Sequence, residues 1–409
     1  MSKKTCGKEA VKEWNIIKLG DICHTTSGGT PNRSKKQYYQ GDIPWVKSGE
    51  LNDGYIFDSE EKLTEEGLKN SSAKLFDAGT LLIAMYGATA GRTAILRKPA
   101  ATNQAICAIF QNESVNLEFI RFAFLYKRDF LLRLRHGGAQ PNLNQMIIND
   151  FELSIPSLPE QKAIARVLTT IQEAIAGQEV LIAKLKELKK SMMQYLFTHG
   201  TRGEKTKMTE IGEMPERWGV VELGGTCEIV GSSITFKQAE NKNGENEVHG
   251  IKVSDMNTIG NEKYIVCAKT NFKFSNIDRL VSPNALIFPK RGAAIATNKK
   301  RITTKCSLLD PNLIAVIPSD KFIADYLFYY FETFDLSTLT DKGTIPQLNK
   351  KDLLPIQLPT PSKEEQAEVV KVLNTTTNKV ESTQEKLLAY QNLFKTLLHE
   401  LMSGGRRVN

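Results

Sequence analysis

The chain has 409 residues, of which 41% are hydrophobic, and a formal net charge of +8. This length exceeds the roughly 150 residues of a usual domain, so more than one domain is expected. The start of the chain lacks the apolar core of a signal peptide, and no apolar run is long enough to span a membrane. The six cysteines form no Cys-x-x-Cys pair, which argues against a zinc site or a disulfide framework and favours the reducing cytoplasm.

Seven segments follow one another along the chain, and together they indicate an α+β fold of two mixed α/β blocks, each followed by a long helix. The segments are an N-terminal extension (1–13), a first block (14–159), a long helix (160–200), a linker (201–217), a second block (218–361), a second long helix (362–405) and a C-terminal tail (406–409).

The first block begins with a glycine-proline turn, Gly28–Pro31, that leads into a basic and polar stretch ending at Trp45. Leu81–Met85 and Ala105–Phe110 are short apolar runs of the kind found in buried strands. Asn116–Arg135 carries apolar and aromatic residues at helical spacing. We expect those aromatic side chains in the hydrophobic core rather than as platforms for base stacking.

The first long helix is predicted from a heptad pattern, in which mostly apolar residues recur at alternating steps of four and three. It contains no proline, and Gly200 supplies a stop signal. The seam positions are Ile164, Leu168, Ile171, Ile175, Gln178, Ile182, Leu185, Lys189, Met192 and Leu196.

The second block has a similar plan. Ala285–Phe288 and Leu313–Ile317 are predicted strands, and Lys321–Phe334 is a predicted aromatic-rich helix. Between the strands, Arg291–Ile302 is interpreted as a hairpin with its tip near residues 298–300. The glycine-proline turn of the first block has no counterpart here; a polar, partly acidic loop between Gly231 and Gly250 takes its place.

The second long helix repeats the seam of the first at numbers 205 higher, with Thr383 matching Gln178. Two such stripes most simply bury each other, although each helix could instead dock on its own block. Only 17 residues separate the first helix from the second block, so the second helix must run back along the first. We therefore expect an antiparallel coiled coil of roughly 60 Å with one block at each end.

The repeat also extends into the blocks, which indicates tandem duplication of a block-plus-helix unit. The matching stretches are Trp14–Cys23 with Trp218–Cys227, Val46–Leu51 with Ile251–Met256, Gly138–Asn144 with Gly343–Asn349, and Leu153–Gln161 with Leu358–Gln366. We expect the third pair to be structural, capping the approach to each long helix. A shared frame with divergent loops is typical of two readers of different targets.

Several short motifs, in this order and twice over, make the chain resemble the DNA-specificity subunit of type I restriction–modification systems over nearly its whole length. In the first block they are Ser27–Pro31, Gly41–Trp45, Gly87–Gly91 and Asn103-Gln104. In the second they are Ile211–Trp218, Phe288–Gly292, Thr297–Arg301 and Asp310–Asn312. The missing Gly-Gly-Thr-Pro turn in the second block leaves open which residues its loop uses.

The resemblance implies that each block is a target recognition domain reading one half of an asymmetric bipartite site on double-stranded DNA. It also implies that the helix pair sets the spacer and docks two modification methyltransferase subunits, to which restriction/translocase subunits are added. No cofactor is expected in this chain; S-adenosylmethionine and ATP with magnesium are expected on the partner subunits.

Candidate residues for DNA contact are selected by two criteria. Cations can bind the phosphates, and Arg, Lys, Asn or Gln can reach the base edges. In the first block they are Lys35, Lys36, Lys47, Arg92, Asn103 and Gln104. In the second they are Lys252, Lys290, Arg291, Asn298, Lys299, Lys300 and Arg301.

An enzymatic function is not expected. The sequence has neither a phosphate-binding P-loop nor a dinucleotide fingerprint, and its five histidines show no ligand or catalytic spacing. Asp310–Leu313 lacks the second proline and the aromatic residue of an amino-methyltransferase motif. Glu60–Lys62 fits a nuclease-type Glu-x-Lys pattern, but so short a pattern often arises by chance. The alternative function is a scaffold whose helices join two protein-interaction domains without touching DNA.

Overall fold

The computed structural model describes residues 14–135, 142–231, 236, 246–274, 280–340 and 346–408. The chain forms two compact units, one made of residues up to 179 together with 385 onward, and the other of residues 180–384. The long helices α6 (Leu158–His199) and α12 (Lys363–Met402) each contribute one half to each unit. Within the described residues, no helix has the length and apolar character needed to cross a membrane.

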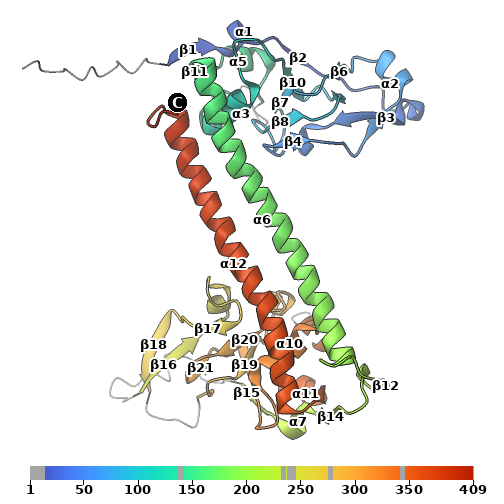
Figure 1. Cartoon of the computed structure of the whole chain (residues 1–409), viewed down its shortest axis with the longest axis vertical. Helices are drawn as coiled ribbons and strands as arrows, with labels where there is room; N and C mark the ends of the chain where they lie inside the picture. Colours follow the sequence, from blue (N-terminus) through green and yellow to red (C-terminus); the bar gives the residue numbers. More distant parts are fainter. Residues whose placement is uncertain are drawn as a thin grey trace, which may run out of the picture. The chain divides into compact units, whose positions relative to one another are not determined.

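The first unit is built on a five-stranded sheet in the order β2-β10-β7-β8-β4, a four-stranded sheet in the order β5-β3-β9-β6, and the antiparallel pair β1-β11 (Figure 1). Its strands are β1 (Asn15–Lys18), β2 (Thr25–Ser27), β3 (Tyr39–Val46), β4 (Tyr55–Ile56), β5 (Lys62–Leu63), β6 (Leu75–Phe76), β7 (Leu81–Ala84), β8 (Thr93–Leu96), β9 (Ala100–Thr102), β10 (Ile106–Ile109) and β11 (Glu152–Ile155). Its shorter helices are α1 (Leu19–Ile22), η1 (Lys36–Tyr38), η2 (Ser48–Glu50), α2 (Glu65–Lys69), α3 (Leu117–Tyr126), α4 (Arg128–Arg133) and α5 (Gln145–Asn149).

The second unit repeats this plan with a five-stranded sheet in the order β15-β22-β19-β20-β17, a three-stranded sheet in the order β18-β16-β21, and the pairs β14-β23 and β12-β13. Its strands are β12 (Thr206–Thr209), β13 (Gly212–Pro215), β14 (Gly219–Glu222), β15 (Glu228–Gly231), β16 (Asn246–Ile251), β17 (Tyr264–Ile265), β18 (Thr270–Phe274), β19 (Leu286–Pro289), β20 (Arg301–Thr303), β21 (Ser307–Leu309), β22 (Leu313–Ile317) and β23 (Gln357–Thr360). Its shorter helices are α7 (Leu223–Thr226), η3 (Val253–Asn257), α9 (Ala293–Ala296), α10 (Ala324–Glu332), η5 (Leu336–Leu339) and α11 (Lys350–Leu353).

Both five-stranded sheets are buried on two faces, which explains why their central strands are continuous apolar runs. Along β7, Leu81 and Ile83 enter the core shared with α3, whereas Leu82 and Ala84 enter a second core against the four-stranded sheet. In β19, Leu286 and Phe288 alternate in the same way with Ile287. The predicted strands and aromatic-rich helices are thus confirmed. Every tyrosine and phenylalanine of α3 and α10 except Tyr126 is buried.

The long helices pack antiparallel inside each unit. In the first unit, Ile164 and Leu168 near the start of α6 share a core with Leu401 near the end of α12. In the second unit, Met193 and Leu196 near the end of α6 share a core with Val369 and Leu373 near the start of α12. The predicted seam is confirmed. α12 ends at Met402, however, three residues before the predicted end of the second long helix at 405, and Gly404 has the left-handed backbone typical of a helix end, with a φ of +73°.

The Glu-Gln pair at the start of each long helix ties that helix to its own block. The Gln161 side chain accepts a hydrogen bond from the Asn116 N–H (2.9 Å) and donates to the Pro156 carbonyl (3.0 Å). Gln366 does the same with the Ile323 N–H (2.8 Å) and the Pro361 carbonyl (3.1 Å). Both amides are buried, so each helix begins at a fixed point on the block that precedes it.

The glutamates of these pairs have different partners in the two units. Glu160 forms an ion pair with Arg407, which donates from Nη2 to Oε2 at 2.7 Å. Glu365 accepts from Trp218 Nε1 (2.9 Å) and from Arg217 Nη2 (2.6 Å). A residue that follows the end of one long helix thus closes the start of the other, within each unit.

Replacing Glu365 by alanine should destabilise the protein by about 3 kcal/mol, because it leaves the buried Trp218 N–H without an acceptor and Arg217 without its buried partner. Urea unfolding followed by tryptophan fluorescence measures this change. Glu368→Ala is the matched control on the same helix, since its exposed carboxylate accepts a bond from the Thr201 hydroxyl. Equal midpoints for the two variants would contradict a role for Glu365 in closing the second unit.

Candidate nucleic-acid interface

The turn Gly28–Pro31 lies tightly against the end of β9. A Cβ on Gly28 would lie 2.2 Å from the Thr102 carbonyl oxygen, and one on Gly29 would lie 2.3 Å from the carbonyl of Ser72. Only glycine fits such close backbone approaches. The buried Trp45 indole donates to the Gly29 carbonyl at 3.0 Å, and the Thr30 hydroxyl donates to the side chain of Gln104. The motifs Gly28–Pro31, Gly41–Trp45 and Asn103-Gln104 therefore form one structure.

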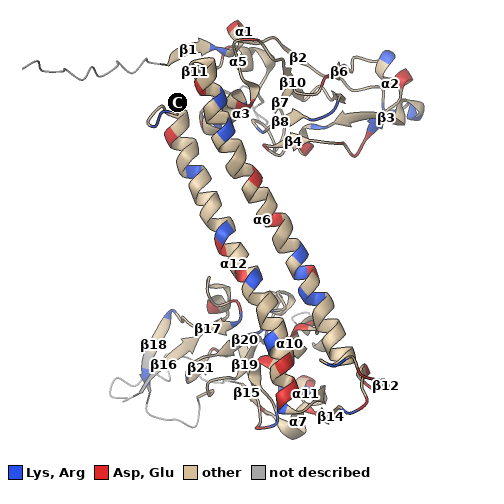
Figure 2. Cartoon of the chain, in the orientation of Figure 1, with Lys and Arg blue, Asp and Glu red and all other residues tan. Residues whose placement is uncertain are grey.

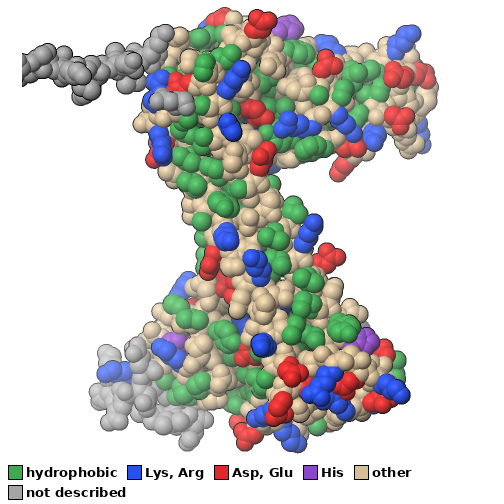
Figure 3. All heavy atoms as spheres, viewed as in Figure 1, with side chains coloured by type: hydrophobic (Ala, Val, Ile, Leu, Met, Phe, Trp, Pro, Cys, Tyr) green, Lys and Arg blue, Asp and Glu red, His purple; other side chains and the backbone are tan. Residues whose placement is uncertain are grey.

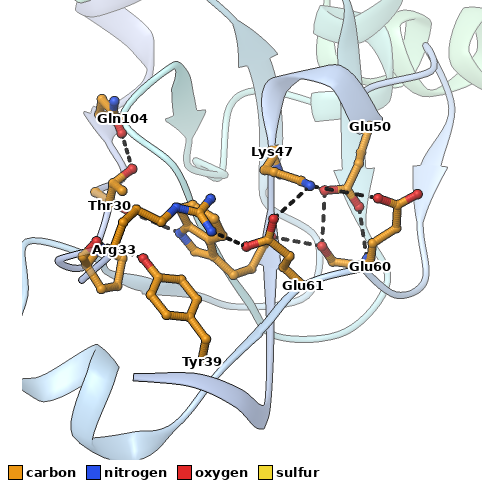
Figure 4. A network of polar contacts seen from close by, with 12 residues as sticks. Thr30, Arg33, Tyr39, Lys47, Glu50, Glu60, Glu61 and Gln104 are labelled. Atoms are coloured by element: carbon orange, nitrogen blue, oxygen red, sulfur yellow. Dashed lines mark hydrogen bonds and ion pairs between the residues drawn. The ribbon is translucent and has the colours of Figure 1, made fainter. Parts of the chain in front are cut away.

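Arg33 follows this turn, and its guanidinium is held on more than one side (Figure 4). Its Cζ atom lies 4.8 Å from the centre of the Tyr39 ring and 4.7 Å from that of Trp45. One edge of the guanidinium donates from Nη1 to Glu61 Oε2 at 2.6 Å. The side chain nevertheless remains 53% exposed, so a rigidly held cation faces solvent.

Lys47 shares the same carboxylate. Its Nζ lies 3.0 Å from Glu61 Oε1 and 3.8 Å from Glu60 Oε2, and its backbone N–H donates to Glu50 Oε1 at 2.8 Å. The hydrogen bond to Glu61 raises the pKa of Lys47. The pKa of Glu61 is in turn lowered, most of all by its hydrogen bond with Arg33. Basic and acidic residues lie close together around β3 and α2 (Figure 2).

The ends of two parallel strands bring Lys47 and Asn103 together. β3 and β9 pair in parallel with Val46 opposite Thr102, so Lys47 and Asn103 are the next residues on neighbouring strands. The Asn103 N–H donates to the Val46 carbonyl (3.0 Å), and its side chain accepts from the Ala105 N–H (3.2 Å). Asn103 therefore shapes the turn that presents the exposed side chain of Gln104.

The second unit has the same framework in different residues. β16 and β21 pair in parallel with Ile251 opposite Leu309, so Lys252 and Asp310 follow the neighbouring strand ends. The Asp310 N–H donates to the Ile251 carbonyl (2.9 Å), and its side chain accepts from the Asn312 N–H (2.9 Å). Each block thus places one lysine beside one polar turn, with Asn103-Gln104 of the first block replaced by Asp310–Asn312 in the second.

The remaining predicted residues of the first block, Lys35, Lys36 and Arg92, are exposed. Lys35 Nζ donates to the Tyr38 hydroxyl at 2.9 Å, and Lys36 opens η1. Arg92 lies in the turn between β7 and β8. Within the described residues, no hydrogen bond or ion pair joins these three cations to the Gly28–Pro31 turn.

The predicted hairpin at Arg291–Ile302 is only partly correct. β19 and β20 pair antiparallel, with Leu286 opposite Ile302, but their connection contains the short helix α9 instead of a tight turn. Gly292 enters it with a φ of +63°, and Ile295 fixes it by packing into the core. The sequence Ala-Ala-Ile-Ala favours helix, which outweighed the turn signal further along.

The basic residues after α9 differ in their surroundings. Lys300 is buried, and its Nζ donates to Asn298 Oδ1 (2.8 Å) and to the Phe334 carbonyl (2.9 Å). Asn298 itself donates to the same carbonyl (3.0 Å) and accepts from the Leu336 N–H (2.9 Å). Arg301 donates to the carbonyls of Lys300 (2.6 Å) and Met256 (2.8 Å). In this structure these three side chains hold the protein's own backbone.

Lys290, Arg291 and Lys299 are the more accessible cations of this region. Arg291 is exposed, and Lys290 and Lys299 are half-buried. Lys299 Nζ donates to the side chain of Asn257 at the end of η3, five residues beyond Lys252. The Lys290 backbone bonds to Asn312 (2.7 Å) and to Leu348 (2.9 Å), next to the polar turn of this block.

The Glu60–Lys62 pattern has structural partners. The Glu61 oxygens accept from Arg33 and Lys47, and Lys62 Nζ pairs with Asp58 at 3.5 Å. Over the described ranges, no group of three or more His, Cys, Asp or Glu residues could hold a metal ion.

Of the two stretches predicted to cap the approach to a long helix, residues 138–141 and 343–345 lie outside the described residues, and the described ends cap the short helices α5 and α11. Asn144 caps α5 by accepting from the Ile147 N–H at 2.8 Å. Asn349 and Asp352 form a capping box on α11. Both short helices precede the strand that leads into a long helix. The sequence did not lead us to select Arg33 or Asn312 for DNA contact, although Arg33 lies two residues beyond the Ser27–Pro31 motif and Asn312 is the last residue of the Asp310–Asn312 motif.

Burial lowers the pKa of Lys300 to about 8, partly offset by Glu332 and Asp335. The unfolded chain, with the ordinary value of 10.5, binds more protons than the folded protein between these values. Stability should therefore rise with pH across this window by on the order of 3 kcal/mol and should lack this gain below it.

Urea unfolding at pH values below and above this range, compared between the wild type and Lys300→Met, measures the contribution of Lys300 to the pH dependence of stability. The variant has no ammonium to bury, so its stability should not show the rise. Lys299→Met is the control and should follow the wild type. A constant difference between wild type and Lys300→Met at all pH values would contradict the burial of a titrating ammonium.

Comparison with known proteins shows which family and which proteins this chain resembles. A family model described as the type I restriction modification DNA specificity domain matches residues 11–187 and again residues 215–389. The chain is 24% identical to the type I restriction enzyme MjaVIII specificity subunit of Methanocaldococcus jannaschii, over 99% of this chain and 96% of that protein. It is also 24% identical to the MjaIX specificity subunit of the same organism, over 97% and 94%.

Solved structures share the fold. The S subunit of a type I restriction–modification system from M. genitalium superposes with a TM-score of 0.63 at 14% identity, covering 97% of each chain. A chain from a study of complex assembly and conformational transition in the type I R-M system gives 0.52 at 18% identity, covering 97% of this chain and 99% of that one. Because the family model matches most of the sequence in two copies, this chain belongs to the type I restriction modification DNA specificity family, as a specificity subunit with two target recognition domains.

Proposed function

We propose that residues 14–159 and 218–361 each read one half of an asymmetric bipartite site on double-stranded DNA. The observation that carries this proposal is the framework present in both units, a lysine beside a polar turn at the ends of two parallel strands. Lysine suits the phosphate backbone, and Asn, Gln and Asp side chains suit base edges. The framework is shared while its turn residues differ, as two readers of different sequences require.

The helix pair would dock two modification methyltransferase subunits. Both long helices carry large apolar side chains at the surface, which is the chemistry of a protein-binding face (Figure 3). On α6 these are Val180, Leu181, Leu188 and Tyr195; on α12 they are Val372, Leu388 and Leu393. In this proposal restriction/translocase subunits join the complex through the methyltransferases.

Chemistry would take place on the partner subunits, with S-adenosylmethionine on the methyltransferases and ATP with magnesium on the translocase. This chain would contribute recognition and spacing, without a catalytic step and within the cytoplasm. The rival function, a scaffold that joins two proteins without DNA, gives no reason for lysines at the same strand ends in both units.

We propose that two sets of residues contact DNA. In the first block they are Lys35, Lys36, Lys47, Arg92, Asn103 and Gln104, and in the second block they are Lys252, Lys290, Arg291 and Lys299. Asn298, Lys300 and Arg301 are proposed to act indirectly, by shaping the loop that carries Lys299.

Lys299→Ala should weaken DNA binding and make the plot of log K against log salt shallower by about 0.9, the effect of one lost phosphate contact. A mobility-shift titration of the complex with its methyltransferase subunits, on duplex DNA carrying the site found by methylation mapping, gives both quantities. Lys321→Ala, which removes an exposed lysine elsewhere in the second unit, should change neither. Absence of any salt-dependent binding by the wild-type complex would favour the scaffold instead.

Inserting seven residues into both long helices, at Gln178 and Thr383, should lengthen the preferred spacer by up to about three base pairs. Seven residues keep every seam position on its face and add about 10.5 Å, against about 3.4 Å per base pair of duplex DNA. Binding to targets with spacers one to four base pairs longer is the measurement. A folded double insertion that still prefers the original spacer would show that the helices do not set the distance; insertion into α6 alone should instead reduce stability.

A further inference from the structure

We propose that Arg33 reads a guanine in the half-site bound by the first recognition domain. The inference rests on the proposed DNA-reading function and names one specificity-determining residue within it. It concerns a side chain that belongs to none of the recurring motifs and has no counterpart in the second unit, where the Gly-Gly-Thr-Pro turn is missing.

The position of Arg33 is fixed through its backbone as well as its side chain. The Tyr39 hydroxyl donates to the Pro31 carbonyl at 2.7 Å, and the Trp45 indole donates to the Gly29 carbonyl at 3.0 Å. These are the same two rings that lie against the guanidinium. The turn leading to Arg33 and the Arg33 side chain therefore rest on one aromatic support, of which Trp45 is 1% exposed.

One edge of the guanidinium is occupied and another is available. Nη1 donates to Glu61, whereas Nε and Nη2 have no hydrogen-bond acceptor within the part of the chain that the structure describes. These two donors form a planar fork on a side chain that is 53% exposed. A fork of two parallel donors matches the O6 and N7 acceptors at the major-groove edge of guanine.

Glu61 acts here as a positioning residue. Its carboxylate binds Arg33 through one oxygen and Lys47 through the other, so it fixes the two cations relative to each other. Lys47 stands at the strand end that both recognition domains share, which suits a phosphate contact. Arg33 stands on the turn that only the first domain has, which suits a base contact. A held fork also loses little side-chain entropy on binding, which favours discrimination between bases.

The test uses the complex with its methyltransferase subunits. Methylation-sensitive sequencing with the wild type defines both half-sites. Binding of wild type, Arg33→Ala and Arg33→Lys is then measured on duplexes in which each base pair of the first half-site is replaced in turn. At one G·C pair, Arg33→Ala should lose about 5- to 150-fold of discrimination, the range expected for a single bidentate contact. The preferences at the second half-site should stay unchanged, which also reports that the variant is folded.

Arg33→Lys separates base reading from simple charge, because it keeps the cation but lacks the planar fork. We expect it to keep the salt dependence of the wild type and to lose discrimination at the same G·C pair. Arg97→Ala removes another exposed arginine that lies on an aromatic ring, 3.8 Å from the centre of Tyr55, and should leave all base preferences intact.

Three outcomes would overturn the inference. They are a first half-site without a G·C pair, unchanged discrimination in Arg33→Ala, and full recovery of discrimination in Arg33→Lys, which would show that a cation suffices and that the planar fork is not what reads the base. Failure of the proposed function looks different, since the wild-type complex would then show no bipartite methylation pattern at all.

Discussion

Each compact unit draws its core from two parts of the chain that are far apart in sequence, and this shared burial of α6 and α12 is the constraint on which the structure depends. Leu168 and Leu401 are both fully or almost fully buried in one core, as are Leu196 and Val369 in the other. Burying a leucine contributes about 1.5–3 kcal/mol. Neither helix could keep its apolar stripe from water alone, so the contact between the two helices completes the core of each unit.

Onto this support the duplication places one framework twice. Parallel strand ends position a lysine and a polar turn in each unit, and buried glutamines start each long helix at the same place. The elements that differ are those that the framework presents: Asn103-Gln104 against Asp310–Asn312, and the Arg33 turn against a different loop. The rigid framework is repeated in both units, whereas the turns that it carries differ. One fold can in this way carry two different binding surfaces.

The sequence predicted the features that depend on periodicity. The seam of the long helices, the buried strands and the aromatic helices all follow from spacings along the chain, and each is present. The sequence did not predict side-chain contacts in which the partner lies far along the chain. Lys300 looks like a surface cation in a basic run, but its acceptor is the carbonyl of Phe334, which no local pattern reveals. Residues 293–296 (Ala-Ala-Ile-Ala) show the reverse case, in which local helix preference placed α9 in the connection for which a tight hairpin turn was predicted. Arg33 was not singled out because its support comes from residues further along the chain, Tyr39 and Trp45 on β3 and Glu61 just before β5.

The order of synthesis gives the shared core a further meaning. A ribosome that has completed Leu168 must add more than 200 residues before it reaches Leu401, which takes roughly 10 to 50 s at common elongation rates. During that time the first recognition domain lacks the strip of core that α12 supplies. Residues near the start of α6 then remain open to water and to chaperones. The first domain can therefore complete this core only after the last turns of α12 have been made.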